Sequence, residues 1–83
     1  MTNQLHSFYV KIEGVNIHHD TERQTEHHGP LWSIDALQAA IEAGRKSKNT
    51  DPTKLMHASV YACDAVWEIW LTPDAKEDTE TTE

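Results

Sequence analysis

The chain has few of the features that stabilise small secreted proteins or direct proteins to membranes. Among its 83 residues Cys63 is the single cysteine, which excludes an internal disulfide. The N-terminus lacks the charged and then apolar pattern of a signal peptide. Asp64 and Glu68 interrupt the one long apolar run, 55–71, and each acid would cost about 2.5–3.5 kcal/mol near a bilayer centre. We therefore expect no membrane span and a cytoplasmic location.

Basic residues are scarce: seven Lys and Arg stand against 14 Asp and Glu, so the formal net charge is −7. A nucleic-acid binder needs a basic footprint, and an anionic membrane repels an acidic protein, so we expect neither as a partner. Residues 74–83, DAKEDTETTE, carry five acids and one lysine, and their largest apolar side chain is alanine. This composition predicts a single folded domain over 1–73 and a disordered acidic tail over 74–83.

The N-terminal segment SFYVKIEGV alternates between apolar and polar residues. Phe8, Val10 and Ile12 fall on one face, as in a half-buried β-strand. Beyond Gly14, the apolar residues Val15 and Ile17 fall at alternate, odd-numbered positions. A second short strand is therefore possible here and would form a hairpin with the first. Residues 18–30 are polar and end in Gly-Pro, which predicts a loop.

A helix is predicted after this loop. Ser33 is a suitable N-cap, and Gly44 is a suitable residue to end the helix. Trp32 precedes the cap and can pack on Leu37 as a hydrophobic staple. Between the two ends, apolar residues recur at spacings of three and four: Ile34, Leu37 and Ile41.

The segment after Pro52 fits two structures. As a helix, it would start at Asp51-Pro52 and carry one polar stripe, Lys54, His57, Tyr61, Asp64 and Glu68. As a β-hairpin, it would have strands at 56–61 and 66–72, rich in residues that favour strands, although the turn between them lacks glycine and asparagine. Local signals favour the helix, whereas the hairpin would pair the first strand more naturally.

The predicted fold class is therefore α+β: a small single domain with an N-terminal strand or hairpin and two helices. The alternative is a three-stranded antiparallel sheet with one helix on one face. In either case the late segment has more aromatic bulk than so small a domain needs, notably Trp67 and Trp70.

For function, we expect a non-enzymatic protein–protein interaction module, such as a small acidic inhibitor or adaptor. Small acidic inhibitors of phages and mobile elements have this general build, an analogy of class alone. Trp67 and Trp70 would anchor the partner, because tryptophan is enriched at binding hot spots. Asp64 and Glu68 would steer a basic partner. The sequence shows no nucleophile with an adjacent base, so we do not expect catalysis.

Two other functions remain open. The run HHDTERQTEHH contains four histidines that together offer enough donors for zinc or nickel: His18, His19, His27 and His28. Adjacent histidines point in different directions, so each pair can supply one metal ligand easily and two only with distortion. Apart from such a metal ion, we expect no cofactor. Alternatively, a structural homodimer would cover the excess apolar face.

Overall fold

The computed structural model describes residues 4–73, so the predicted acidic tail at 74–83 lies outside the described residues. Two β-hairpins flank a single helix along the chain. The elements are β1 (His6–Val15), β2 (Arg23–Ser33), α1 (Ala36–Lys46), β3 (Met56–Tyr61) and β4 (Val66–Leu71).

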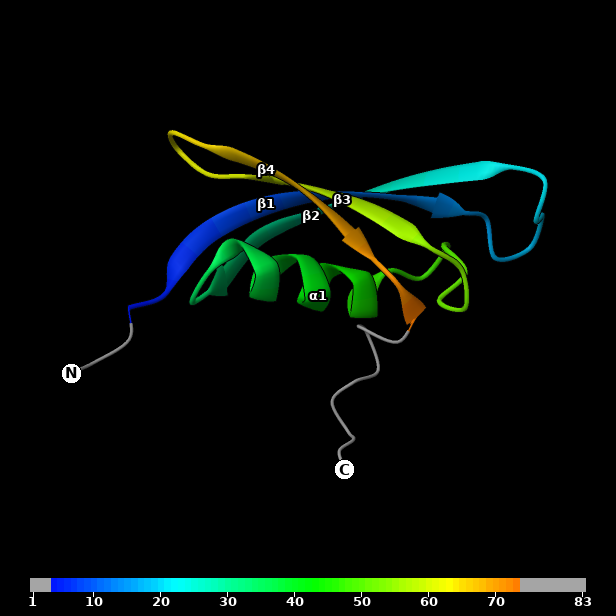
Figure 1. Cartoon of the computed structure of the whole chain (residues 1–83), viewed down its shortest axis with the longest axis horizontal. Helices are drawn as coiled ribbons and strands as arrows, with labels where there is room; N and C mark the ends of the chain where they lie inside the picture. Colours follow the sequence, from blue (N-terminus) through cyan, green and yellow to red (C-terminus); the bar gives the residue numbers. More distant parts are fainter. Residues whose placement is uncertain (1–3, 74–83) are drawn as a thin grey trace, which may run out of the picture.

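The four strands form one antiparallel sheet in the order β2-β1-β3-β4, and α1 covers one face of it (Figure 1). The α+β class is confirmed. The prediction of two helices is wrong, and the alternative with one helix is right except that the sheet has four strands. The central strands are β1 and β3, and the edge strands are β2 and β4.

The segment after Pro52 forms the hairpin and not the helix. Asp51 does cap a turn, since its carboxylate accepts hydrogen bonds from the Thr53 amide and hydroxyl at 2.9 and 2.6 Å, but the turn ends there. Strand β3 then pairs with β1 from Tyr9↔Tyr61 to Glu13↔His57. The spacing of apolar residues predicted a helix here, and that prediction is wrong because the backbone of β1 needs hydrogen-bond partners on both sides. The spacing of residues within 52–72 carries no information about this requirement.

The predicted loop at 18–30 is mostly strand β2. Pairing runs from Val15↔Arg23 to His6↔Ser33, and the true loop lies between Val15 and Arg23. There the Asn16 side chain accepts hydrogen bonds from two successive backbone amides, at 2.7 and 3.0 Å. Both faces of the first half of β2 carry polar residues, so it lacks the apolar alternation by which strands are recognised.

The pairing of β2 with β1 shifts register at Tyr9. Opposite it, Gly29 has a φ of +146°, and the Gly29–Pro30 peptide bond is cis. A Cβ atom on Gly29 would lie 2.6 Å from Tyr9 Cδ2 and 3.1 Å from Tyr9 Cα. Only glycine fits here, because side chains disfavour this φ and Tyr9 fills the space.

The helix begins two residues later than predicted. Asp35 is the N-cap, and its carboxylate accepts a hydrogen bond from the Gln38 amide at 2.9 Å, whereas Ser33 is the last residue of β2. Trp32 lies on the face of the sheet away from α1 and is 61% exposed, so it forms no staple with Leu37, itself 51% exposed.

Small residues form the buried side of α1: Ala36, Ala39, Ala40, Ala43 and Gly44. The sheet supplies the large core side chains, which are Phe8, Val10, Ile12, Leu31, Met56, Val60 and Leu71. Alanine side chains let the helix axis approach the sheet closely, so little volume separates the two layers. Leu37 on the helix and Ile34, which lies just before it, stay at the surface.

This close packing predicts that Ala40→Leu destabilises the fold by about 1–3 kcal/mol, because the added atoms have no space at a fully buried position. Gln38→Leu adds apolar bulk at an exposed position of the same helix and should leave the free energy of unfolding within about 0.5 kcal/mol. Urea denaturation of the two variants measures the difference. Equal stabilities would show that the helix does not lie this close to the sheet.

The fit of Gly29 against Tyr9 predicts that Gly29→Ala costs about 1–3 kcal/mol of stability, because the backbone there is strained for alanine and the methyl group displaces Tyr9. Thr25→Ala, at an exposed position of the same strand, is the control. Thermal unfolding followed by circular dichroism compares both variants with the parent chain. An unchanged melting temperature for Gly29→Ala would contradict the described conformation.

Candidate functional site

The face of the sheet opposite α1 carries an unusual number of exposed aromatic side chains. Four of them belong to Tyr9, Trp32, Tyr61 and Trp70, with exposures of 56, 61, 38 and 61%. Together with their polar neighbours these residues define the open face, which comprises Tyr9, Lys11, Glu13, His27, Trp32, His57, Ser59, Tyr61, Val66, Glu68 and Trp70. A solvated face of an antiparallel sheet is ordinarily polar, so this composition marks the open face as the candidate site.

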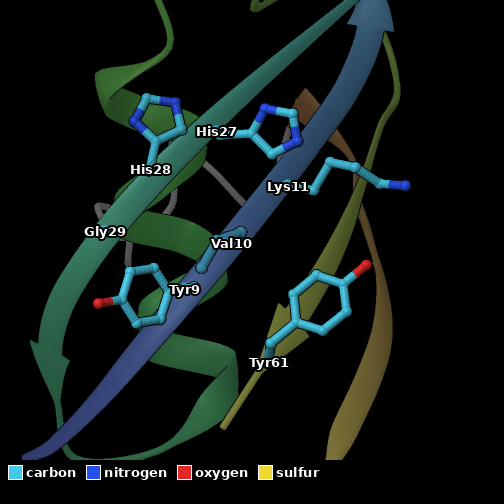
Figure 2. A pocket seen from close by; sticks show the side chains of 7 residues that line it. All are labelled: Tyr9, Val10, Lys11, His27, His28, Gly29 and Tyr61. Carbon is cyan, nitrogen blue, oxygen red and sulfur yellow. The ribbon is translucent and has the colours of Figure 1, made fainter.

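Cross-strand pairing places three of these side chains in one row. Tyr9 pairs with Tyr61, which in turn pairs with Val66 on the edge strand. A shallow pocket of about 290 Å³ lies beside the two tyrosines of this row, lined also by Lys11 and His27. In Figure 2, both tyrosine rings and the Lys11 and His27 side chains stand on the near side of the sheet, with α1 behind it. The pocket thus combines aromatic surface with two nitrogen donors.

A second row of the open face centres on His57. Its Nε2 atom lies 2.9 Å from Glu68 Oε1, and its Nδ1 atom lies 3.8 Å from Glu13 Oε1. The Ser59 hydroxyl donates to the same Glu68 oxygen at 3.0 Å. Serine and histidine therefore both bind the carboxylate and not each other, so this cluster lacks the hydroxyl-to-imidazole hydrogen bond of an activated nucleophile.

The cluster holds Trp70 in place. The ring centroids of His57 and Trp70 are 4.6 Å apart, and the imidazole is only 17% exposed. One side of the indole is supported in this way, while the side chain stays largely open to solvent. An aromatic side chain fixed before binding loses little conformational entropy on binding, which favours a contact role.

The predicted partner-binding residues divide between two surfaces. Trp70 and Glu68 lie on the open face, whereas Trp67 lies on the helix side of β4 and packs edge-on against Phe8, with ring centroids 5.9 Å apart. Asp64 lies in the β3–β4 turn and lines, with Trp67, a pocket beside the start of α1. The four residues were predicted as one site on a helix, and alternation along a strand separates them.

The four histidines are separated too. His18 and His19 lie in the exposed β1–β2 loop. His27 and His28 are neighbours in β2, and they point to opposite faces of the sheet. Over residues 4–73, no group of three or more His, Cys, Asp or Glu side chains is arranged to hold a metal ion. Zinc or nickel binding by this run stays a prediction from the sequence alone.

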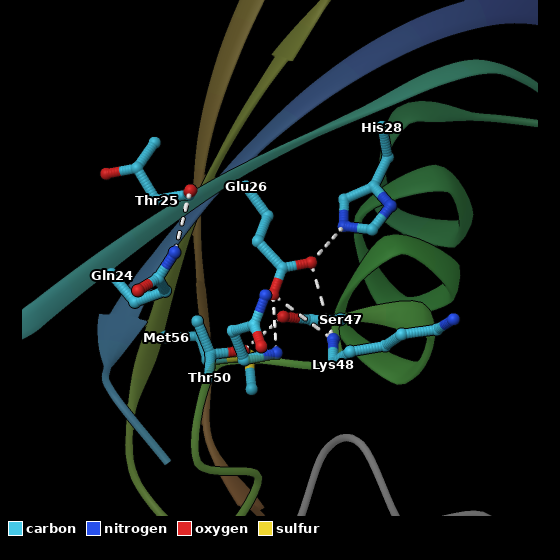
Figure 3. Close-up of polar contacts among 9 residues, drawn as sticks. Gln24, Thr25, Glu26, His28, Ser47, Lys48, Thr50 and Met56 are labelled. Atoms are coloured by element: carbon cyan, nitrogen blue, oxygen red, sulfur yellow. Dashed lines mark hydrogen bonds and ion pairs between the residues drawn. The ribbon is translucent and has the colours of Figure 1, made fainter. Parts of the chain in front are cut away.

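His28 instead joins a polar cluster between β2 and the segment after α1 (Figure 3). Its Nε2 atom lies 3.3 Å from Glu26 Oε1, although the angles are not those of a hydrogen bond. The Glu26 carboxylate also accepts hydrogen bonds from the amides of Lys48 and Asn49 at 3.1 and 2.6 Å. This carboxylate therefore fastens the chain leaving α1 to the sheet.

Burial by itself raises the pKa of Glu26, whose side chain is 14% exposed. Hydrogen bonds from the Asn49 amide, the Ser47 hydroxyl and the Lys48 amide, with the nearby His28 ring, outweigh burial and leave this pKa below its ordinary value of 4.5. The folded state therefore holds the Glu26 proton less tightly than the unfolded state does. Stability from this group is complete above about pH 4.5 and is lost as the pH falls through the lowered pKa.

We accordingly expect Glu26→Gln to lower the free energy of unfolding at pH 7 by about 1–3 kcal/mol, because charged acceptors make the stronger hydrogen bonds. The difference from the parent chain should shrink as the pH falls below 4.5, because the unfolded parent binds the proton first and the folded carboxylate follows as the pH passes its lowered pKa. Glu22→Gln, at an exposed loop position, is the control. Urea denaturation at pH 7 and pH 3 measures the effect. A difference that is independent of pH would show that the charge of Glu26 is unimportant.

Comparisons of the chain with protein-family models, with curated proteins and with solved structures gave no match. Within the part of the chain that the structure describes, no helix is long and apolar enough to cross a membrane. Sequence reasoning named Trp70 and Glu68 but missed Tyr9 and Tyr61, which form the centre of the open face. The alternation along β1 could have placed Tyr9 on the solvent face of the sheet. The sequence could not have placed Tyr61 beside it, because their contact depends on the pairing of β1 with β3.

Proposed function

We propose that the protein is a non-enzymatic, cytoplasmic protein–protein interaction module, and that its partner binds the open face. The exposed indole of Trp70, supported by His57, is the observation that carries the proposal. Interfaces are enriched in tryptophan, tyrosine and arginine at their energetic centres. Trp70, Tyr61 and Tyr9 would provide such a centre, and the carboxylates of Glu13 and Glu68 would lie beside it.

The partner should present a basic rim around an apolar centre. The chain has a net charge of −7, and acidic groups on and beside the open face include Glu13, Glu68 and Asp64. Long-range attraction to a basic surface raises the association rate more than the final affinity. A small acidic inhibitor or adaptor fits this description. Trp67 and Asp64 would add contacts only where the partner passes around the edge strand β4, because they lie outside the open face.

Affinity capture from the native host, followed by titration calorimetry with the purified partner, tests the proposal. We expect Trp70→Ala and Tyr61→Ala each to weaken binding at least about tenfold, since truncating a hot-spot aromatic commonly costs about 2 kcal/mol or more. Leu37→Ala removes a similarly exposed apolar side chain from α1, on the other side of the molecule, and should leave the affinity unchanged.

Two results would contradict this function. One is a partner whose affinity falls with Leu37→Ala but not with the two open-face variants. The other is full binding by a folded Trp70→Ala protein, which would remove the anchor from the proposal. Increasing salt should lower the association rate if the partner is basic, because screening weakens attraction between exposed charges.

A further inference from the structure

The two edges of the sheet differ in how well they are protected from pairing with another strand. Strand β2 contains Gly29 and Pro30 near its middle, and proline has no amide hydrogen to donate. Strand β4 reads VWEIWL and contains neither proline nor glycine nor a basic residue. Natural proteins protect edge strands with such residues, so β2 is protected and β4 is not.

The outer edge of β4 also has no partner strand among residues 4–73. Its side chains are apolar on both faces of the sheet, and Val66, Trp67 and Trp70 are 55, 39 and 61% exposed. The one charged residue of the strand is Glu68. An added strand would satisfy the free backbone groups and cover part of this apolar surface at the same time.

We propose that a second copy of this chain pairs antiparallel with the outer edge of β4, so that two sheets join into one of eight strands. Two-fold symmetry limits the registers, because directly opposite residues must lie on the same face. A register centred on Glu68 sets the two Glu68 carboxylates against each other, which is unfavourable. A register centred on Ile69 sets Glu68 opposite Trp70 and Trp67 opposite Leu71, without any pair of like charges.

The other symmetric registers are poorer. Centring on Trp67 would pair only the first three residues of β4 and would overlap the β3–β4 turns. Centring on Trp70 would place Trp67 opposite Pro73, which cannot donate a hydrogen bond. Ile69 therefore defines the register, and all six residues of β4 have a partner in it.

The same features favour a second copy over an unrelated chain. The strand is complementary to itself in this register, and the pairing consumes both unprotected edges at once. The joined sheet then ends in two β2 edges, each carrying Pro30, so growth stops at a dimer. Because the symmetry axis is perpendicular to the sheet, the two open faces become continuous, with Trp70 and Glu68 of each copy at the centre.

Sedimentation velocity over a dilution series from about 1 mM to about 1 μM tests the dimer. A six-residue edge makes a small interface, so we expect dissociation within this range. Amide exchange of the unmodified chain gives an independent readout: the outward-facing amides of β4 should be protected at high concentration only. A monomer throughout the series, with β4 exchange independent of concentration, would overturn the proposal.

Two substitutions at one exposed position test the register. Trp70→Glu and Trp70→Lys both remove the indole, but the first sets a carboxylate opposite Glu68 of the second copy and the second sets an ammonium there. We expect the Glu variant to dimerise at least about tenfold more weakly than the Lys variant, since the symmetric interface contains this pair twice. Equal dimerisation would overturn the Ile69-centred register.

Tyr61→Ala separates this proposal from the proposed function. Tyr61 lies on β3, away from the β4 edge, so its removal should leave the dimer intact while it weakens the partner. Loss of the dimer in a folded Tyr61→Ala protein would show that copies associate through the open face and not through the edge.

Discussion

The fold depends on the position of β1 in the middle of the sheet, where its backbone must form hydrogen bonds on both sides. Residues 23–33 satisfy one side and residues 56–61 the other. Neither segment is recognised as a strand from its local sequence alone: residues 23–28 are polar on both faces, and residues 56–61, although rich in residues that favour strands, also fit a helical spacing. Once β1 is extended and buried, both segments must be extended too, because unpaired backbone groups in a core cost more than local preference supplies.

This dependence explains which parts of the fold could be read from the sequence. The strand over Phe8, Val10 and Ile12 and the helix before Gly44 follow from periodicity within one segment, and both exist. The hairpin at 56–71 depends on a strand some 45 residues away, so no window of local sequence contains its cause. The hairpin was also hard to recognise because two of its buried residues, Ala58 and Ser59, are small and add little to an apolar pattern.

The candidate site was harder to predict than the fold for a related reason. Successive side chains of a strand point to opposite faces. Trp67 and Trp70 are three positions apart in β4, an odd number, so they lie on opposite faces of the sheet. On the helix favoured by local signals, the same interval would have placed them together. Tyr9 and Tyr61 show the converse: they are 52 positions apart in sequence, and only the register of β1 against β3 makes them neighbours.

The arrangement of small and large residues accounts for where apolar surface is left over. Alanines on α1 bring the helix close to the sheet and fill little volume, so one short helix covers only the inner face. The outer face has no second layer among residues 4–73, yet it carries tryptophan and tyrosine in place of the usual polar residues. In a domain of this size, aromatic side chains that stay in water contribute little to stability, because burial of apolar surface is the main favourable term in folding. Trp70, Tyr61 and Tyr9 lie on the open face and Trp67 at the β4 edge, so the surface that this arrangement of layers leaves apolar is the same surface that a partner or a second copy would cover.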